Sequence, residues 1–292
     1  MVTLNLKKFD MRKISFKPNE PKGPVIALIG KRDTGKSYLV KDMLYYHQDI
    51  PIGTVISGTE EGTGFYGELI PKLFIHYEYN TEIIANILKR QKKVVKKATN
   101  LMNYYKKNKI DPGKNNIDPR AFVIMDDCLF DNKWASDKRM RFLFMNGRHW
   151  KAMLVITMQY PLGMPPILRT NIDYVFILRE NYIANRKKIF DNYAGMFPTF
   201  GTFCQVMDQC TENYECLVID NNSKSNKLQD QVFWYKADEH KDFKLGSQKF
   251  WDISKDLKDN DDDEDEAYDP NNMKMKKNET RISVKKSNWS IK

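Results

Sequence analysis

The stretch VIALIGKRDTGKS, residues 25–37, joins an apolar strand to a complete phosphate-binding loop. Its spacing places small residues where a backbone must curl around an anion, and the following helix adds the partial positive charge of its N-terminus. Lys36 would reach the β- and γ-phosphates, the Ser37 hydroxyl would coordinate Mg²⁺, and Asp33 would point outward. The stretch predicts an ATP-binding site formed by Gly30, Lys31, Arg32, Asp33, Thr34, Gly35, Lys36 and Ser37.

Short apolar runs alternate with helical stretches along the rest of the chain. Strands are predicted at 24–30, 52–57, 121–125, 152–158, 173–178 and 215–219, with further possible strands at 74–79 and 231–235. Helices are predicted at 36–47, 81–109, 136–147, 181–194 and 200–210. Such alternation is typical of a parallel sheet covered on both faces. The predicted fold class is therefore α/β, a doubly wound and mainly parallel sheet of the P-loop NTPase type.

Composition divides the chain into three parts. Residues 1–22 are charged and mixed and form an N-terminal lead-in, and residues 23–250 form the P-loop domain. Residues 251–292 lose the periodicity, pass through an acidic run at 259–266 with seven carboxylates, and end in a Lys- and Asn-rich stretch. Because such a composition cannot bury enough apolar surface to offset the entropy of ordering, we expect this tail to be disordered.

The body of the chain is strongly basic. The sequence holds 48 Lys and Arg against 38 Asp and Glu, a net charge of +10. A basic surface favours nucleic acid or another polyanion, although surplus lysine also serves solubility. The four cysteines show neither zinc nor disulfide spacing, and no stretch reaches the roughly 18 apolar residues of a membrane span. We therefore expect a soluble protein in a reducing intracellular compartment.

Two adjacent aspartates, Asp126 and Asp127, follow the apolar strand at 121–125. Open α/β sheets bind ligands at the carboxyl ends of their strands, so Asp126 would hold Mg²⁺ there and Asp127 would act as the base for the attacking water. The alternative is an ordinary strand-to-turn junction capped by two aspartates. The next strand ends with Thr157 and Gln159 on one face, and Gln159 is the candidate that contacts the attacking water and senses the nucleotide.

The chain resembles the genome-packaging ATPases of nucleocytoplasmic large DNA viruses, which belong to the FtsK/HerA-like branch of P-loop ATPases. Besides the phosphate loop, the likeness rests on VIMDD at 123–127, NGRHW at 146–150, ITMQ at 156–159 and LRTNIDYVFILR at 168–179. The resemblance implies an additional-strand catalytic core, a ring of identical subunits, and ATP-driven translocation of double-stranded viral DNA into a preformed capsid. It also implies capsid or portal-type proteins as partners, in the host cytoplasm or the virion.

This family commonly has Glu where the chain has Asp127, and its ring members commonly complete each active site with an arginine from the neighbouring subunit. The favoured candidates for that arginine are Arg148 and Arg169, and Arg179 is the third. Each of these side chains could instead pair with a carboxylate of its own subunit.

The helix predicted at 81–109 carries nine basic and no acidic residues between Lys89 and Lys109. It could line a DNA path through attraction to phosphates that reads no bases, or it could present a solvated lysine face. Two other functions stay open, a P-loop nucleotide or polynucleotide kinase and a nucleotide-dependent scaffold or switch. A kinase would need an acceptor pocket and an arginine-rich lid, for which Arg186 and its lysine neighbours are a faint match.

Overall fold

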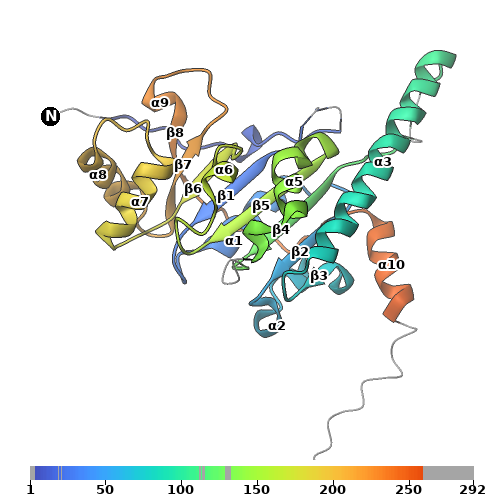
Figure 1. Ribbon diagram of the computed structural model, residues 1–292, viewed down its shortest axis with the longest axis horizontal. Coiled ribbons are helices and arrows are strands. Elements are labelled where there is room, and N and C mark those ends of the chain that lie inside the picture. The colour runs from blue at the N-terminus through green and yellow to red at the C-terminus, as the bar shows by residue number, and fades with distance from the viewer. Residues whose placement is uncertain are drawn as a thin grey trace, which may run out of the picture. The chain divides into compact units, whose positions relative to one another are not determined.

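An eight-stranded sheet forms the centre of the computed structural model, which describes residues 4–18, 20, 22–111, 113, 116–128 and 133–258 (Figure 1). The strand order is β3-β2-β4-β5-β1-β6-β7-β8. The strands are β1 (Val25–Ile29), β2 (Gly53–Ser57), β3 (Ile75–His76), β4 (Ala121–Asp126), β5 (Ala152–Met158), β6 (Tyr174–Ile177), β7 (Glu215–Asp220) and β8 (Val232–Lys236). Pairing is parallel from β3 to β6, and β7 and β8 add an antiparallel edge.

Strand β5 lies between β1, which leads into the phosphate loop, and β4, which ends on Asp126. This inserted strand is the feature that the additional-strand type of P-loop core requires. All residues of β1, β4 and β5 are buried, as continuous apolar strands covered on two faces must be. The predicted fold class is confirmed.

Helices connect the strands close to the predicted positions. They are α1 (Lys36–Tyr45), α2 (Glu60–Thr63), α3 (Thr81–Asn108), α4 (Lys133–Ser136), α5 (Lys138–Asn146), α6 (Pro166–Arg169), α7 (Ile183–Tyr193), α8 (Phe200–Cys210), α9 (Leu228–Gln231) and α10 (Gln248–Lys258). Short 3₁₀ turns are η1 (Met11–Lys13), η2 (Tyr66–Glu68), η3 (Lys72–Phe74) and η5 (Gly147–Trp150). No helix among the described residues is both long and apolar enough to cross a membrane.

Two apolar cores cover the sheet, one on each face. Alternate residues of β1 point to opposite faces, so Ile26 and Leu28 pack with α1 while Ala27 and Ile29 pack in the core that includes α3, α5, α7 and α8. Burying one such side chain stabilises the fold by about 1.5–3 kcal/mol. The strands that carry the candidate site are therefore held rigidly from both sides.

The N-terminal segment belongs to the core that covers α1. The backbone of Phe9 donates to the Trp234 carbonyl at 2.8 Å, which fixes the segment beside β8. Apolar side chains recur along it at short intervals and are buried: Phe9, Met11, Ile14 and Phe16. The lead-in predicted at 1–22 is thus not a separate part over its described residues, because these side chains fill one face of the sheet.

Helix α10 crosses the predicted limit between the P-loop domain and the tail. Phe250 is buried with its ring centroid 4.3 Å from that of Phe74, and Trp251 Nε1 donates to the Leu245 carbonyl at 2.8 Å. The two aromatic side chains anchor the start of this helix, so the limit at residue 251 falls inside an ordered element. The acidic run predicted at 259–266 lies outside the described residues.

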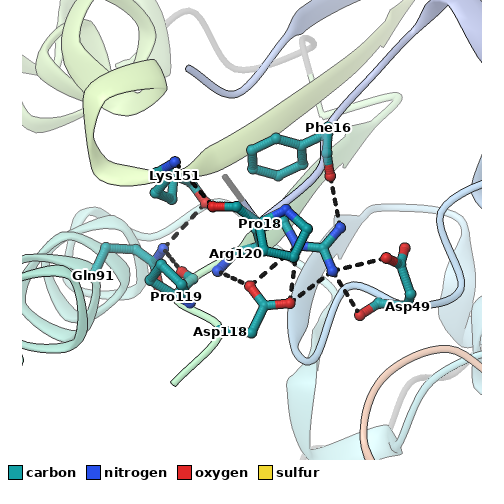
Figure 2. Close-up of polar contacts among 8 residues, drawn as sticks. All are labelled: Phe16, Pro18, Asp49, Gln91, Asp118, Pro119, Arg120 and Lys151. Atoms are coloured by element: carbon teal, nitrogen blue, oxygen red, sulfur yellow. Dashed lines mark hydrogen bonds and ion pairs between the residues drawn. The ribbon is translucent and has the colours of Figure 1, made fainter. Parts of the chain in front are cut away.

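A buried arginine closes the amino edge of the sheet, the edge opposite the phosphate loop (Figure 2). Arg120 precedes β4, and its guanidinium donates hydrogen bonds to the Asp118 carboxylate. It also donates to Asp49 Oδ2 at 2.8 Å and to the Phe16 carbonyl at 2.6 Å. On the same edge the Gln91 amide of α3 donates to the Pro119 carbonyl at 2.9 Å. These bonds join the N-terminal segment, α3 and β4, and leave the carboxyl edge for the site.

Candidate nucleotide-binding site

Two glycines of the phosphate loop occupy places that a larger residue would strain. Gly35 has φ +93° and is the N-cap of α1, and this left-handed conformation suits glycine. A methyl group on Gly30 would lie 2.7 Å from Thr34 Oγ1 and 2.8 Å from Leu178 Cβ. Asp33, also left-handed at φ +60°, is exposed, as the sequence predicts. The loop thus has the tight curl that brings backbone amides around an anion.

Lys36 is the buried cation of the loop, with 7% of its surface exposed. Its Nζ donates to the Lys31 carbonyl at 2.7 Å across the loop. Burial lowers the pKa of Lys36, and the nearby carboxylates of Asp127 and Asp126 oppose that shift. This electrostatic coupling places the loop and the end of β4 around the same space, as the sequence predicts for the two motifs.

Asp126 is the last residue of β4 and is buried. Thr157 Oγ1, one strand away on β5, donates to Asp126 Oδ1 at 2.5 Å. Burial raises the pKa of this carboxyl group, while the Thr157 hydroxyl, the neighbouring Tyr66 hydroxyl and Lys36 act to lower it. A cation bound here would therefore stabilise a charge that the protein alone stabilises incompletely.

Asp127 turns away from the strand with φ +50°, a conformation that Asp and Asn tolerate better than most residues. Its backbone amide donates to Thr157 Oγ1 at 3.1 Å, and its Oδ2 accepts a hydrogen bond of 2.6 Å from Gln159 Nε2. The carboxylate is half-buried, in contrast to the enclosed Asp126. Asp127 and Gln159 thus form one polar unit at the carboxyl ends of β4 and β5.

Tyr66 is a site residue that sequence reasoning missed. Its ring is fully buried in the turn after α2, and its hydroxyl lies beside the Asp126 carboxylate without the geometry of a hydrogen bond to any described residue. Burial and that carboxylate raise the pKa of Tyr66. The buried Glu60 side chain fixes the turn by accepting from the amides of Tyr66 at 2.9 Å and Gly67 at 2.7 Å. No short motif marks this pair.

Glu180 is a second residue without a sequence signal. It is buried after β6, and its Oε1 lies 2.8 Å from Nζ of Lys31 in the phosphate loop. Burial opposes ionisation of Glu180, but hydrogen bonds from Lys31, the Tyr182 amide and Asn185 outweigh it and lower the pKa. The Lys31 ammonium also lies 3.5 Å from the centroid of the Tyr182 ring. One side of the loop is therefore tied to the segment after β6.

The predicted arginines do not lie together, because Arg148 is at the amino edge of the sheet and Arg179 follows the carboxyl end of β6. Arg148 Nη2 lies 3.3 Å from the Asp173 carboxylate and donates to the Asn171 carbonyl at 3.0 Å, so its own subunit holds it at the amino edge. Arg169 donates to the Met164 carbonyl at 2.8 Å and to Asn192 Oδ1, and its guanidinium lies 5.6 Å from the centroid of the Tyr193 ring. Arg179 is exposed at the carboxyl end of β6. These contacts favour a structural role for Arg148 over one in a neighbouring subunit.

The side chains present fit Mg²⁺ held together with a triphosphate. The described residues hold no cluster of three or more His, Cys, Asp or Glu side chains that could cage a metal alone. Mg²⁺ is commonly bound through one or two carboxylates together with substrate phosphates. The Ser37 hydroxyl and the Asp126 carboxylate, whose pKa burial raises, are the donors suited to that arrangement.

Comparison with known sequences finds relatives in large DNA viruses. The chain is 41% identical over 251 residues to the uncharacterized protein L437 of Acanthamoeba polyphaga mimivirus, covering 86% of this chain and 83% of the relative. It is 37% identical over 258 residues to the uncharacterized protein 075L of Invertebrate iridescent virus 6, covering 86% and 93%. No protein-family profile matches the chain.

Comparison with solved structures supports the fold. The genome packaging NTPase B204 of Sulfolobus turreted icosahedral virus 2, in complex with AMPPCP, aligns with TM-score 0.50 and 16% identity over 76% of this chain and all of that one. The conjugation coupling protein TcpA of pCW3, with ATPγS, aligns with TM-score 0.50 and 16% identity over 74% of this chain and 60% of TcpA. At this identity, the likeness establishes a shared P-loop NTPase fold.

Proposed function

Since the chain belongs to the family of large-DNA-virus proteins that includes L437 of mimivirus, we propose that it is an ATPase motor that moves viral double-stranded DNA into a capsid. One arrangement carries the proposal: the phosphate loop, Asp126 and the Asp127–Gln159 pair lie together at the carboxyl edge of β1, β4 and β5. A loop for the nucleotide faces a buried carboxylate and a second, more accessible one. That combination suits hydrolysis of a bound triphosphate.

The residues divide the chemistry between them. Residues 30–37 would hold the phosphates through backbone amides, and Lys36 would neutralise charge that develops on the γ-phosphate. Ser37 and Asp126 would hold Mg²⁺, which when bound screens the phosphate oxygens. Asp127 would accept the proton of the attacking water, and the Gln159 amide, 2.6 Å from its Oδ2, would keep that carboxylate in place and sense the nucleotide.

The net charge, helix α3 and the fold support DNA as the second substrate. The net charge is +10, and the basic helix α3 reaches past the sheet in Figure 1. The fold is shared with a genome packaging NTPase and with a conjugation coupling protein. We extend the proposal to a ring of identical subunits in which Arg169, or the exposed Arg179, completes the neighbouring site, and to capsid or portal-type partners in the host cytoplasm.

Hydrolysis measured with and without duplex DNA at low salt tests this function. The full chain should hydrolyse ATP with Mg²⁺, and duplex DNA should raise turnover, whereas Lys36→Ala should remove turnover in both conditions. If duplex DNA does not change ATP turnover and phosphate is transferred to a small nucleoside or polynucleotide acceptor, the protein is a kinase and not a motor. Binding of ATP without turnover in any condition would replace it by a scaffold or switch.

A further inference from the structure

An exposed tyrosine lies against the phosphate loop from a distant part of the chain. A methyl group placed on Gly35 would lie 3.4 Å from Cδ1 of Tyr214, so the ring rests on the last glycine of the loop. Tyr214 is nevertheless 70% exposed. The contact leaves most of the aromatic surface facing solvent at the mouth of the candidate site.

The turn that presents this ring is held in an unfavourable conformation. Asn213 has φ +51° and Tyr214 has φ +64°, and an aromatic residue in the left-handed region is an outlier. The Glu215 amide donates to the Glu212 carbonyl at 2.8 Å, which closes the turn at the start of β7. Because β7 runs antiparallel to β6, it begins at the edge of the sheet where the phosphate loop lies. The topology therefore brings Tyr214 to the loop.

The strands on the two sides of β1 indicate how a bound nucleotide is oriented, with its γ-phosphate toward one side and its nucleoside toward the other. The carboxylates for the γ-phosphate end stand on β4, on one side of β1, with β5 between. The nucleoside, at the other end of the triphosphate, must leave the loop on the opposite side. Strands β6 and β7 form that side, and Tyr214 is the aromatic side chain that the structure places there against the loop.

Other exposed tyrosines near the loop already have partners. The Tyr38 ring packs edge-on against Phe65, with centroids 6.1 Å apart, and the Tyr182 ring lies under the Lys31 ammonium. No ring or cation contact to Tyr214 occurs among the described residues. Its face is thus the one that remains free to take a planar ligand.

We propose, on the basis of the proposed ATPase function, that Tyr214 stacks on the purine base of the bound nucleotide and forms the base subsite of the phosphate loop. Stacking of a base on an aromatic ring is tolerant of base identity, because every base offers a flat face. The ring therefore supplies affinity for the nucleoside half of ATP, while the loop supplies affinity for the phosphates. The unfavourable backbone of the turn is retained because it aims the ring.

Binding of ATP and of inorganic tripolyphosphate, each with Mg²⁺, separates the two halves of the site. In the full chain, Tyr214→Asn should weaken ATP binding about tenfold, while tripolyphosphate binding should stay within about twofold of wild type. Asparagine keeps the left-handed backbone and removes the ring, so the turn itself is preserved. Tyr214→Trp should retain ATP affinity, and Tyr77→Asn, the same change at another exposed tyrosine, is the matched control.

Each other outcome overturns the inference. Equal weakening of both ligands by Tyr214→Asn would make the ring a support for the loop, and unchanged ATP binding would exclude stacking. If Lys36→Ala loses both ligands while Tyr214→Asn loses neither, nucleotide binding by the loop stands and this inference alone fails. If the wild-type chain binds neither ligand, the proposed function fails with it.

Discussion

At the residue scale, Asp127 is the group that we propose as the base for the attacking water. We expect Asp127→Asn to lower kcat by about 10²–10⁴-fold, because a positioned base contributes that much, with little change in ATP affinity. Asparagine accepts the φ of +50° at this position, so the backbone is kept. Single-turnover hydrolysis and nucleotide titration check both parts. Asp238→Asn, on the exposed surface, is the control, and unchanged kcat in Asp127→Asn would remove this residue from the chemistry.

Tyr66 offers a test that separates thermal stability from ATP turnover. Its hydroxyl is buried without a hydrogen bond to any described residue, so Tyr66→Phe should leave the thermal midpoint unchanged or raise it. If the hydroxyl orients Asp126 when the site is loaded, turnover should fall about tenfold, as for other groups that support metal ligands. Thermal unfolding and the Mg²⁺ dependence of hydrolysis are the measurements. Full turnover in a stable Tyr66→Phe protein would show that the hydroxyl only fills space.

At this scale, the site residues that could be predicted are those that share a local motif, and their roles stay predictions. Gly30, Lys36 and Asp126 follow spacings that the phosphate loop and strand ends impose, and the structure brings their segments together. Tyr66, Glu180 and Tyr214 reach the same place from separate loops, and only the strand order decides that they meet. Their identities carry no periodic signal, so a single sequence could not indicate them.

At the scale of elements, α3 is the feature that the core does not explain. Its 28 residues span about 42 Å, yet its buried residues are Ile84, Leu88 and Gln91, all near its start. The rest of the helix extends past the sheet in Figure 1, and its lysines are exposed. This projection suits contact with a long, charged partner.

Charge reversal on the outer part of α3 tests that interaction. We expect Lys96→Glu with Lys97→Glu to weaken duplex DNA binding and to reduce the slope of log K against log salt by about 0.9 for each phosphate that these lysines neutralise in the wild-type protein. ATP turnover without DNA should not change. Lys224→Glu with Lys227→Glu, exposed lysines elsewhere, serve as the control pair. Equal effects of the two pairs would assign DNA affinity to net charge alone.

The amino-edge arginine gives a prediction about stability. We expect Arg120→Met to lower the free energy of unfolding by about 3 kcal/mol. The substitution removes the buried hydrogen-bond donor of the Phe16 and Asp49 carbonyls and of the Asp118 carboxylate. Urea unfolding measures the change. The control is Arg12→Met, whose pair with Asp10 is exposed to solvent, so its loss should leave the free energy of unfolding nearly unchanged. Similar destabilisation in both variants would contradict the assigned role.

Elements were predictable to the extent that they are apolar on both faces. The runs at β1, β4 and β5 are continuous and buried, so their positions could be predicted within a residue or two. The antiparallel pairing of β7 and β8 could not be predicted, because parallel and antiparallel strands that are buried on both faces have the same apolar sequence pattern. The N-terminal segment was underestimated because its buried side chains form no strand or long helix.

At the scale of the whole molecule, the charges of body and tail oppose each other. The run at 259–266 follows the basic body in the sequence and carries seven carboxylates, so we expect it to compete with DNA for basic side chains. Deleting residues 259–292, which spares α10, should therefore raise duplex DNA affinity at low salt. Fluorescence anisotropy with labelled duplex measures this change. Unchanged affinity in the truncated chain would show that the tail does not act on the DNA surface.

The proposed function requires that hydrolysis at the phosphate loop moves the protein along duplex DNA. Displacement of a third strand from a DNA triplex, followed in time with the full chain and Mg²⁺, tests it most directly. We expect displacement with ATP, none with a non-hydrolysable analogue, and none with Lys36→Ala at any nucleotide concentration. ATP turnover that is stimulated by duplex DNA and yet leaves the third strand bound would contradict it.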